Sequence, residues 1–188
     1  IAGAICTRAC KFCNTLSGKP LSLDADEPLH IAESVRLMKL DHAVITSVDR
    51  DDLPDLGAAH WAETIREIKR LNPSTTIEAL IPDFQGNVSL INMVTDTRPE
   101  IVSHNIETVR RITPLVRSVA TYECSLKVLK TIAESGITAK SGLMVGLGET
   151  PEEVEQTMDD LLETGCRILT IGQYLQPSRK HYPVAEYI

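Results

Sequence analysis

Aromatic side chains are scarce in this 188-residue chain, because Phe, Trp and Tyr together make up only 4% of it. The core must therefore be built mainly from Leu, Ile, Val, Ala and Met. Long apolar runs are also missing, and none approaches the roughly 20 residues that cross a bilayer. With 43% hydrophobic and 24% charged residues, the composition is that of an ordinary globular protein. We expect no membrane association.

Positive charge is in deficit, since 19 Lys and Arg residues face 26 Asp and Glu residues and the formal net charge is −7. No basic cluster exceeds the short run at residues 178–181. A protein that binds nucleic acid through its phosphates normally needs a basic patch. The charge pattern therefore predicts no nucleic-acid partner.

A start methionine is missing as well. The sequence begins at Ile1 and opens in what reads as the end of a strand. A chain of this length generally forms one domain. We therefore expect residues 1–188 to be a single core domain, truncated at both ends, of a longer protein.

The five cysteines are an odd number, and three of them fall within residues 6–13. This distribution suits a metal site in a reducing compartment better than a disulfide framework.

Apolar runs of strand length alternate with amphipathic helix patterns along the chain. The expected strands cover residues 1–5, 42–47, 76–81, 100–104, 139–146 and 167–172. The expected helices cover residues 28–40, 58–71, 88–95, 107–112, 122–134 and 151–164. The last of these has the clearest start, with Thr150 as N-cap, Pro151 at N1 and Glu153 completing a capping box.

Such alternation implies right-handed crossovers and a parallel sheet. Six strands predict an α/β fold, namely a partial (β/α)6 TIM-like barrel. A doubly wound open sheet is the competing architecture, and the pattern alone separates the two poorly.

Cys6, Cys10 and Cys13 follow the spacing C-x3-C-x2-C directly after the first expected strand. Thiolates are the usual ligands of iron–sulfur clusters, and a tight spacing lets one loop wrap a cluster. Three cysteines leave one iron of a four-iron cluster without a protein ligand. By the logic of catalytic metal sites, that open position binds and activates a small molecule.

A structural zinc site is the alternative, but zinc sites generally use four ligands in two pairs. Only a lone His104 is available to complete this set. Cys124 is expected to face away from the core, and Cys166 to lie at the N-terminal end of the last strand. Sites in such folds lie at the opposite, C-terminal face of the sheet, so we expect a cluster with three ligands.

The cysteine loop after a first strand resembles the signature of the radical S-adenosylmethionine (SAM) superfamily. Residues 142–149 resemble the fifth-strand pattern G-x-I-x-G-x-x-E of that superfamily, with Met144 at the apolar position. Within it, the chain is similar to the lipoyl synthase family over essentially all of its length. The matching segments cover residues 6–13, 44–54, 81–84, 104–108, 140–144 and 170–181.

This resemblance implies a reaction. An electron from a 4Fe–4S cluster cleaves SAM to methionine and a 5′-deoxyadenosyl radical, which removes hydrogen from an octanoyl chain on a lysine of a lipoyl carrier domain. Sulfur then joins at carbon 6 and, in a second round, at carbon 8. The cofactor carries the radical chemistry, and the protein supplies position and shielding.

The resemblance also implies an electron donor such as ferredoxin or flavodoxin, and a cytoplasmic enzyme, or a mitochondrial or plastid one in a eukaryote. Lipoyl synthases hold an auxiliary cluster, consumed as the sulfur source, with an N-terminal three-cysteine motif and a C-terminal Arg-Ser-Ser-Tyr segment. Neither motif occurs here. We therefore expect one cluster in this chain.

Five residues outside the cysteines are expected to bind the cofactor near the ends of strands. The resemblance places Phe12 near the adenine, with core packing as the alternative. It also favours Thr46 and Ser47 as contacts for the methionine part, with a turn role as the alternative. Asn105 and Glu107 can hydrogen-bond a carboxylate, a hydroxyl or a ribose diol. Glu107 is otherwise an ordinary acid in a first helical turn.

Three further residues are expected at the cofactor from the last two strands. A lysine in an apolar strand is expected to face an anion, so Lys140 is assigned to the carboxylate of SAM, with an ion pair to Glu107 or Asp49 as the alternative. Gly146 is expected to let the backbone approach the adenine. Gln173 lies at the C-terminal end of the last strand.

Two alternative functions stay open. One is another sulfur-inserting radical enzyme, similar to biotin synthase, against which the run at residues 173–178 argues. The other is a non-catalytic metal-binding module with three cysteines.

Overall fold

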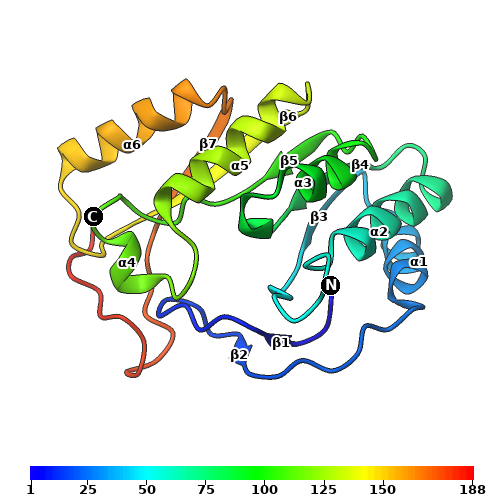
Figure 1. Ribbon diagram of the computed structural model, residues 1–188, viewed down its shortest axis with the longest axis horizontal. Coiled ribbons are helices and arrows are strands. Elements are labelled where there is room, and N and C mark those ends of the chain that lie inside the picture. Colours follow the sequence, from blue (N-terminus) through cyan, green and yellow to red (C-terminus); the bar gives the residue numbers. More distant parts are fainter.

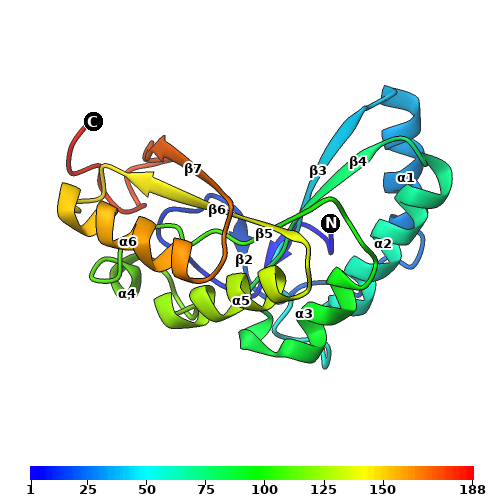
Figure 2. The same cartoon turned by 90° about the horizontal axis from the view of Figure 1, so that it is seen from above.

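The computed structural model describes residues 1–188 and confirms the α/β fold. Five parallel strands form one sheet in the order β3-β4-β5-β6-β7, and the sheet curls into half a barrel with helices along its convex side (Figures 1 and 2). The strands are β3 His42–Thr46, β4 Thr76–Leu80, β5 Ile101–Ser103, β6 Thr138–Val145 and β7 Ile168–Gln173. Because strand order follows chain order without reversal, a doubly wound sheet is excluded.

One helix precedes β3, and the others connect successive strands of this sheet. They are α1 Glu27–Met38, α2 Ala58–Leu71, α3 Val88–Thr95, α4 Thr113–Val116, α5 Tyr122–Glu134 and α6 Pro151–Glu163, with a 3-10 turn, η1, at Phe84–Gly86. None of them combines the length and the apolar character that a membrane crossing requires.

The core lies between the sheet and its helices. Alternate strand residues point to the helical side, where Ala43, Ile77, Ala79, Val102 and Ala139 are almost fully buried. The buried face of α2 meets them with Trp61, Ile65 and Ile68. Burial of each such large side chain contributes roughly 2 kcal/mol.

The expectation of six strands in the sheet is wrong. The first strand, β1 Ile5–Cys6, pairs instead with β2 Leu16–Ser17 in a separate two-stranded parallel sheet. Left-handed backbone at Ala2 and Gly3 interrupts the chain before β1. Backbone hydrogen bonds from Thr7 to Asp49 and from Val48 to Ile1 hold this segment beside the end of β3.

The short helix expected at residues 107–112 is also wrong. Glu107 has left-handed backbone, with φ of 69°, and it forms a parallel bridge with Leu143 that extends the line of β5 along β6. The helix begins later, at Thr113, where Pro114 suits the first turn. The other expected elements are confirmed to within two residues, and the capping box between Thr150 and Glu153 is present.

Candidate active site

A cavity of about 270 Å³ lies where β3, β4 and β5 end. This is the C-terminal edge of the sheet, where parallel α/β folds place their sites. Eight of the residues expected at the site line it, namely Cys6, Cys10, Phe12, Cys13, Thr46, Ser47, Asn105 and Glu107. The fold therefore brings the cysteine loop together with the ends of β3 and β5.

The three cysteines of the loop are free thiols of increasing exposure, from the buried Cys6 to the exposed Cys13. Backbone N–H groups of Arg8 and Asp49 each donate to Cys6 Sγ at 3.4 Å. Burial raises the pKa of the Cys6 thiol, and these two N–H groups oppose the rise. Cys10 Sγ lies 3.9 Å from Ser118 Oγ.

The donor set fits an iron–sulfur cluster. Nowhere do three His, Cys, Asp or Glu side chains converge as ligands of a single metal ion would. The three thiols instead share the wall of one cavity, and thiolates of one loop are the usual ligands of a cluster.

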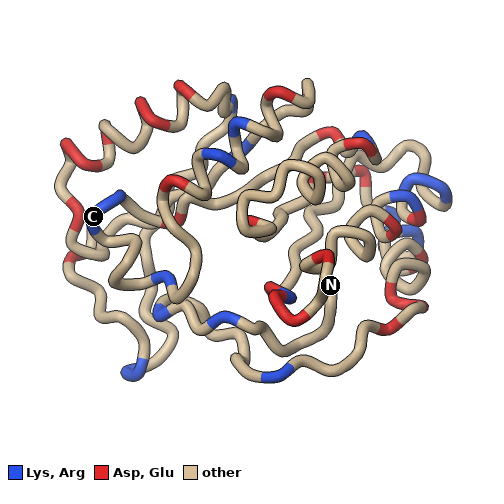
Figure 3. Tube along the Cα trace, in the orientation of Figure 1, with Lys and Arg blue, Asp and Glu red and all other residues tan.

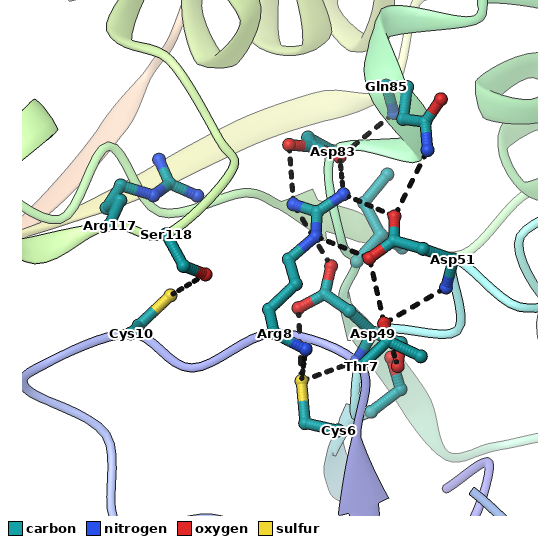
Figure 4. A network of polar contacts seen from close by, with 12 residues as sticks. Cys6, Thr7, Arg8, Cys10, Asp49, Asp51, Asp83, Gln85, Arg117 and Ser118 are labelled. Atoms are coloured by element: carbon teal, nitrogen blue, oxygen red, sulfur yellow. Dashed lines mark hydrogen bonds and ion pairs between the residues drawn. The ribbon is translucent and has the colours of Figure 1, made fainter. Parts of the chain in front are cut away.

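A charged network fastens the loop to the sheet (Figure 4). The buried Arg8 guanidinium donates to both carboxylate oxygens of Asp83, at 2.7 and 2.8 Å, and to both of Asp51, at 2.8 Å. Asp49 lies 3.3 Å from the same group. Burial disfavours the Arg8 charge, but hydrogen bonds to Asp51 and Asp83 outweigh it and raise the pKa of Arg8.

These carboxylates come from the loops after β3 and β4. The acidic loop after β3 lies beside the N-terminal segment in the trace coloured by charge (Figure 3). Thr7 adds a second tie, because its hydroxyl donates to Asp51 at 2.8 Å and its backbone N–H donates to the Asp49 carbonyl at 3.1 Å. Arg8 is thus held from both loops at once, and it fixes the chain between Cys6 and Cys10.

Two carboxyl groups in the cavity have raised pKa values. Burial raises the pKa of Asp49, against the influence of Arg8. Burial also raises the pKa of Glu107, while Arg117 and a hydrogen bond from Asn105 oppose the rise. Both groups face the cavity, where they can accept hydrogen bonds from the hydroxyl or amino groups of a ligand.

His104 is buried in the wall of the cavity, and both of its ring nitrogens are engaged. Nδ1 lies 3.0 Å from the Ile81 carbonyl oxygen, and Nε2 lies 3.0 Å from Ser125 Oγ. Burial lowers the pKa of His104 to about 4. The histidine that sequence suggested as a fourth zinc ligand is therefore occupied by the protein itself.

Comparison with known proteins identifies the family. The model of the radical SAM superfamily matches residues 1–161. Lipoyl synthases match all 188 residues: that of Phocaeicola vulgatus is 73% identical and is covered over 66% of its length, and that of Bacteroides thetaiotaomicron is 71% identical and covered over 67%. The chain belongs to the lipoyl synthase family of the radical SAM superfamily.

The family match covers the whole chain, but the chain spans only about two thirds of the length of these lipoyl synthases. Solved structures agree on the fold. The hydrogenase maturase HydG superposes with a TM-score of 0.75 at 15% identity, over 96% of this chain and 44% of that one. Methylornithine synthase superposes with a TM-score of 0.74 at 11% identity, over 98% and 54%. The radical SAM family implies a 4Fe–4S cluster and SAM.

Lys140, which sequence assigned to the cofactor, does not line the cavity. Its ammonium forms an ion pair with Glu78 on β4, at 2.8 and 2.9 Å, and Ser103 on β5 donates to the same carboxylate at 2.9 Å. The anion that Lys140 faces is therefore a neighbour on the concave face of the sheet.

Gly146 and Gln173 also lie outside the cavity lining, where the ends of β6 and β7 meet the C-terminal residues. A Cβ at Gly146, whose φ is 95°, would clash with the Gln173 side chain and lie 2.5 Å from the Glu186 carbonyl oxygen. Gln173 donates to the Tyr174 and Glu186 carbonyls and accepts from the Ile188 N–H. In this structure Gly146 thus permits close approach of the chain's own C-terminal segment.

Reasoning from sequence missed Arg8, Asp51, Asp83 and Arg117 as site residues. A signal for the first three was present, because an arginine inside a cysteine loop and aspartates directly after two strands meet at one edge of a parallel sheet. Cys166 lies buried at the N-terminal start of β7, as expected. Cys124 is half-buried, and its sulfur lies 3.4 Å from the position that a Cβ on Gly86 would take, so the expectation that it faces solvent is wrong.

Proposed function

We propose that this chain is the radical-generating core of a lipoyl synthase. Its substrate would be an octanoyl chain on a lysine of a lipoyl carrier domain, into which sulfur is inserted at carbon 6 and carbon 8. One observation carries the proposal: three thiols from one loop share a cavity with polar groups from the ends of β3 and β5. The high identity to lipoyl synthases over all 188 residues supports the choice of substrate.

Cys6, Cys10 and Cys13 would hold a single 4Fe–4S cluster. When bound, the cluster supplies the electron that cleaves SAM and starts the radical chemistry on the alkyl chain. The protein's part is to keep the three sulfurs in place, through the Arg8 network and the N–H groups directed at Cys6.

Side chains on the cavity wall would orient SAM. Ser47 Oγ accepts a hydrogen bond from the Trp61 indole at 3.1 Å, which leaves its own proton free to be donated into the cavity. Asn105 and Glu107 offer an amide and a carboxyl group for hydroxyl or amino groups. Phe12 is half-buried against the cluster of Val109, Ile112 and Val116, so its ring forms an apolar part of the wall.

The proposal includes partners. An octanoylated carrier protein would be the substrate, a ferredoxin or flavodoxin the electron donor, and the cytoplasm the location. Sulfur would come from an auxiliary cluster held by residues other than these 188.

Isotope transfer tests this function. The iron-loaded protein is mixed with reductant, SAM and a peptide that carries a perdeuterated octanoyl-lysine. It should form 5′-deoxyadenosine that contains deuterium, because a C–D bond of the octanoyl group breaks as a new C–D bond forms at the 5′ carbon. Cys10→Ala should lose iron, from about four per chain to background, and should form no product. Cys124→Ala, which removes a half-buried cysteine outside the cavity, is the matched control and should behave as the parent chain.

Formation of unlabelled 5′-deoxyadenosine alone would support SAM cleavage, which is the chemistry of the superfamily, but would contradict the proposed octanoyl substrate. Deuterium transfer from labelled dethiobiotin instead of the peptide would favour the alternative similar to biotin synthase. Colourless zinc-bound protein that ignores SAM would favour the non-catalytic module.

A further inference from the structure

The segment just before α5 holds the cysteine loop on both sides of Cys10. The Lys11 N–H donates to the Val116 carbonyl at 2.7 Å, and the Ala9 N–H donates to Ser118 Oγ at 3.1 Å. With these two hydrogen bonds in place, Ser118 Oγ lies 3.9 Å from Cys10 Sγ (Figure 4). The sulfur of the middle cysteine is therefore in contact with a side chain from outside its own loop.

The hydrogen bond between Ser118 and Cys10 has a fixed direction when Cys10 ligates iron. A backbone N–H can only donate, so the Ser118 oxygen accepts from Ala9 and keeps its own proton for a second partner. Cys10 Sγ is the one acceptor that this hydroxyl contacts. A cysteine that ligates a metal is deprotonated, so the sulfur can only accept. The hydroxyl must then donate to the sulfur.

The sulfurs of the other two cysteines receive hydrogen bonds from backbone N–H groups. Two such groups donate to Cys6 Sγ, and the Thr15 N–H donates to Cys13 Sγ at 3.5 Å. Cys10 is thus the one cysteine of the loop whose sulfur has a side-chain donor. A single substitution can remove this hydrogen bond without any change of the loop sequence.

Hydrogen bonds to the ligand sulfurs are among the factors that set the reduction potential of an iron–sulfur cluster. Reduction adds one negative charge, and a donor to an anionic acceptor forms a stronger hydrogen bond than a donor to a neutral one. A hydroxyl that donates to Cys10 Sγ therefore stabilises the reduced form more than the oxidised form, which raises the potential.

We propose that Ser118 raises the reduction potential of the cluster through its hydrogen bond to Cys10. The inference rests on the proposed function, which assigns a 4Fe–4S cluster to the three cysteines. In the reduction, one electron passes from the reductant to the cluster, and the proton of Ser118 stays on its oxygen. Ser118 acts through Cys10 and makes the cluster easier to reduce.

A redox titration of the iron-loaded protein, followed by the electron paramagnetic resonance signal of the reduced cluster, tests the proposal. Ser118→Ala should make the midpoint potential more negative, so that the ratio of reduced to oxidised cluster at a fixed solution potential falls about threefold or more. Ser118→Thr keeps the hydroxyl and should titrate close to the parent protein. Because Ser118 is exposed, we expect these variants to fold.

The matched control is Ser34→Ala, which removes the hydroxyl of an exposed serine on α1 that donates to the His30 carbonyl. This variant should titrate as the parent protein does. An unchanged potential in Ser118→Ala overturns the inference, even if that variant takes up less iron, because the hydroxyl would then only hold the loop through Ala9.

A second pair of variants covers the case in which Ser118→Ala holds no iron. Ser118→Val has the shape of Ser118→Thr without the hydroxyl, so its potential should be the more negative of the two. Equal potentials in this pair overturn the inference, and so does a loss of iron from both the Ala and the Val variants. A parent protein that holds iron and cleaves no SAM contradicts the proposed function, whereas a parent that cleaves SAM with a potential insensitive to Ser118 contradicts the inference alone.

Discussion

Arg8, which lies between Cys6 and Cys10, holds together several acidic residues of the site. It lies within hydrogen-bond distance of Asp83 and Asp51 and close to Asp49, and only 5% of it is exposed. One buried cation therefore compensates several carboxylates, of which Asp83 is itself 2% exposed. Removing one partner from a buried ion pair leaves uncompensated charge, which is far more costly than the net stabilisation of the pair.

Arg8→Met should accordingly destabilise the fold by about 3–5 kcal/mol and reduce the iron that the chain takes up. Urea unfolding and iron analysis measure the two effects. Arg8→Lys should lie between, because an ammonium cannot serve two carboxylates with a planar fork. Arg66→Met should change stability by no more than about 0.5 kcal/mol. An Arg8→Met protein with unchanged stability and iron content would show that the network is dispensable.

His104 predicts a pH dependence of stability. Its folded-state pKa is about 4, against an ordinary value of 6.5, so the unfolded chain binds the proton more readily in this window. Stability then rises with pH from 4 to 6.5, and the contribution of this one group is about 3 kcal/mol. The contribution is complete above pH 6.5 and is lost as the pH falls toward 4.

His104→Gln should flatten that dependence, because the new side chain carries no charge at any pH. The difference between the two proteins in urea unfolding at pH 4.5 and pH 7 isolates the histidine, since Asp49, Asp51 and Glu107 titrate in both. Parallel stability curves for parent and variant would contradict the assignment.

Sequence predicted the cysteines and the polar residues at the ends of β3 and β5 because their positions follow from local pattern and strand direction. Sequence did not reveal the ion pair of Lys140, because Glu78 lies on β4, two strands away, and only the folded sheet brings its carboxylate to the lysine. Arg117 lies in a loop without periodic pattern, so nothing local points its side chain into the cavity.

At the scale of elements, β4, β5 and β6 are linked on the concave face by Glu78, Ser103 and Lys140. Glu78 is only 6% exposed at its side chain, so its charge depends on Lys140. Lys140→Met should destabilise the fold by about 3 kcal/mol, while the affinity for SAM in the folded protein stays unchanged. The double variant with Glu78→Leu should recover much of the loss, because an apolar pair replaces a buried ion pair at little cost.

Urea unfolding and SAM binding of the three variants decide this point. A loss of SAM affinity in Lys140→Met without a loss of stability would return the lysine to the role that sequence assigned to it.

The elements that sequence predicted best are those with periodic faces and strong end signals. Helix α6 begins where its capping box requires, and α2 ends where Asn72 and Pro73 interrupt the pattern. The pair β1 and β2 has two residues per strand, which is too short for a period to be seen. The apolar spacing of residues 107–112 predicts a helix. In the structure, however, Glu107 forms a β-bridge with Leu143, and the helix begins only at Thr113.

At the scale of the whole molecule, the five cysteines fall into two groups. Cys6, Cys10 and Cys13, which we propose as cluster ligands, line one cavity, whereas Cys124 and Cys166 lie outside its lining. Cys166 is buried with its sulfur near the Ala139 and Ile168 carbonyls, and Cys124 packs against the turn at Gly86. We therefore expect neither of them to hold a second cluster.

We therefore expect the 188-residue polypeptide, given octanoylated peptide, SAM and reductant, to cleave SAM and to form no lipoyl product. Adding the N- and C-terminal segments found in lipoyl synthases should restore sulfur insertion. Mass spectrometry of the peptide measures this, because each inserted sulfur adds a distinct mass. Lipoyl peptide made by the 188 residues alone would mean that the sulfur source lies within them.

The sequential strand order predicts where along the chain amino-acid substitutions are tolerated. Strands β3, β4 and β5 each contribute residues to the cavity at their C-terminal ends, and the chain then continues to a helix on the far side of the sheet. Substitutions should therefore be tolerated poorly at the C-terminal ends of these strands and tolerated well on the exposed surfaces of the helices between them. A saturation mutagenesis profile of the chain should show separate short segments of low tolerance, with the lowest tolerance in the cysteine loop.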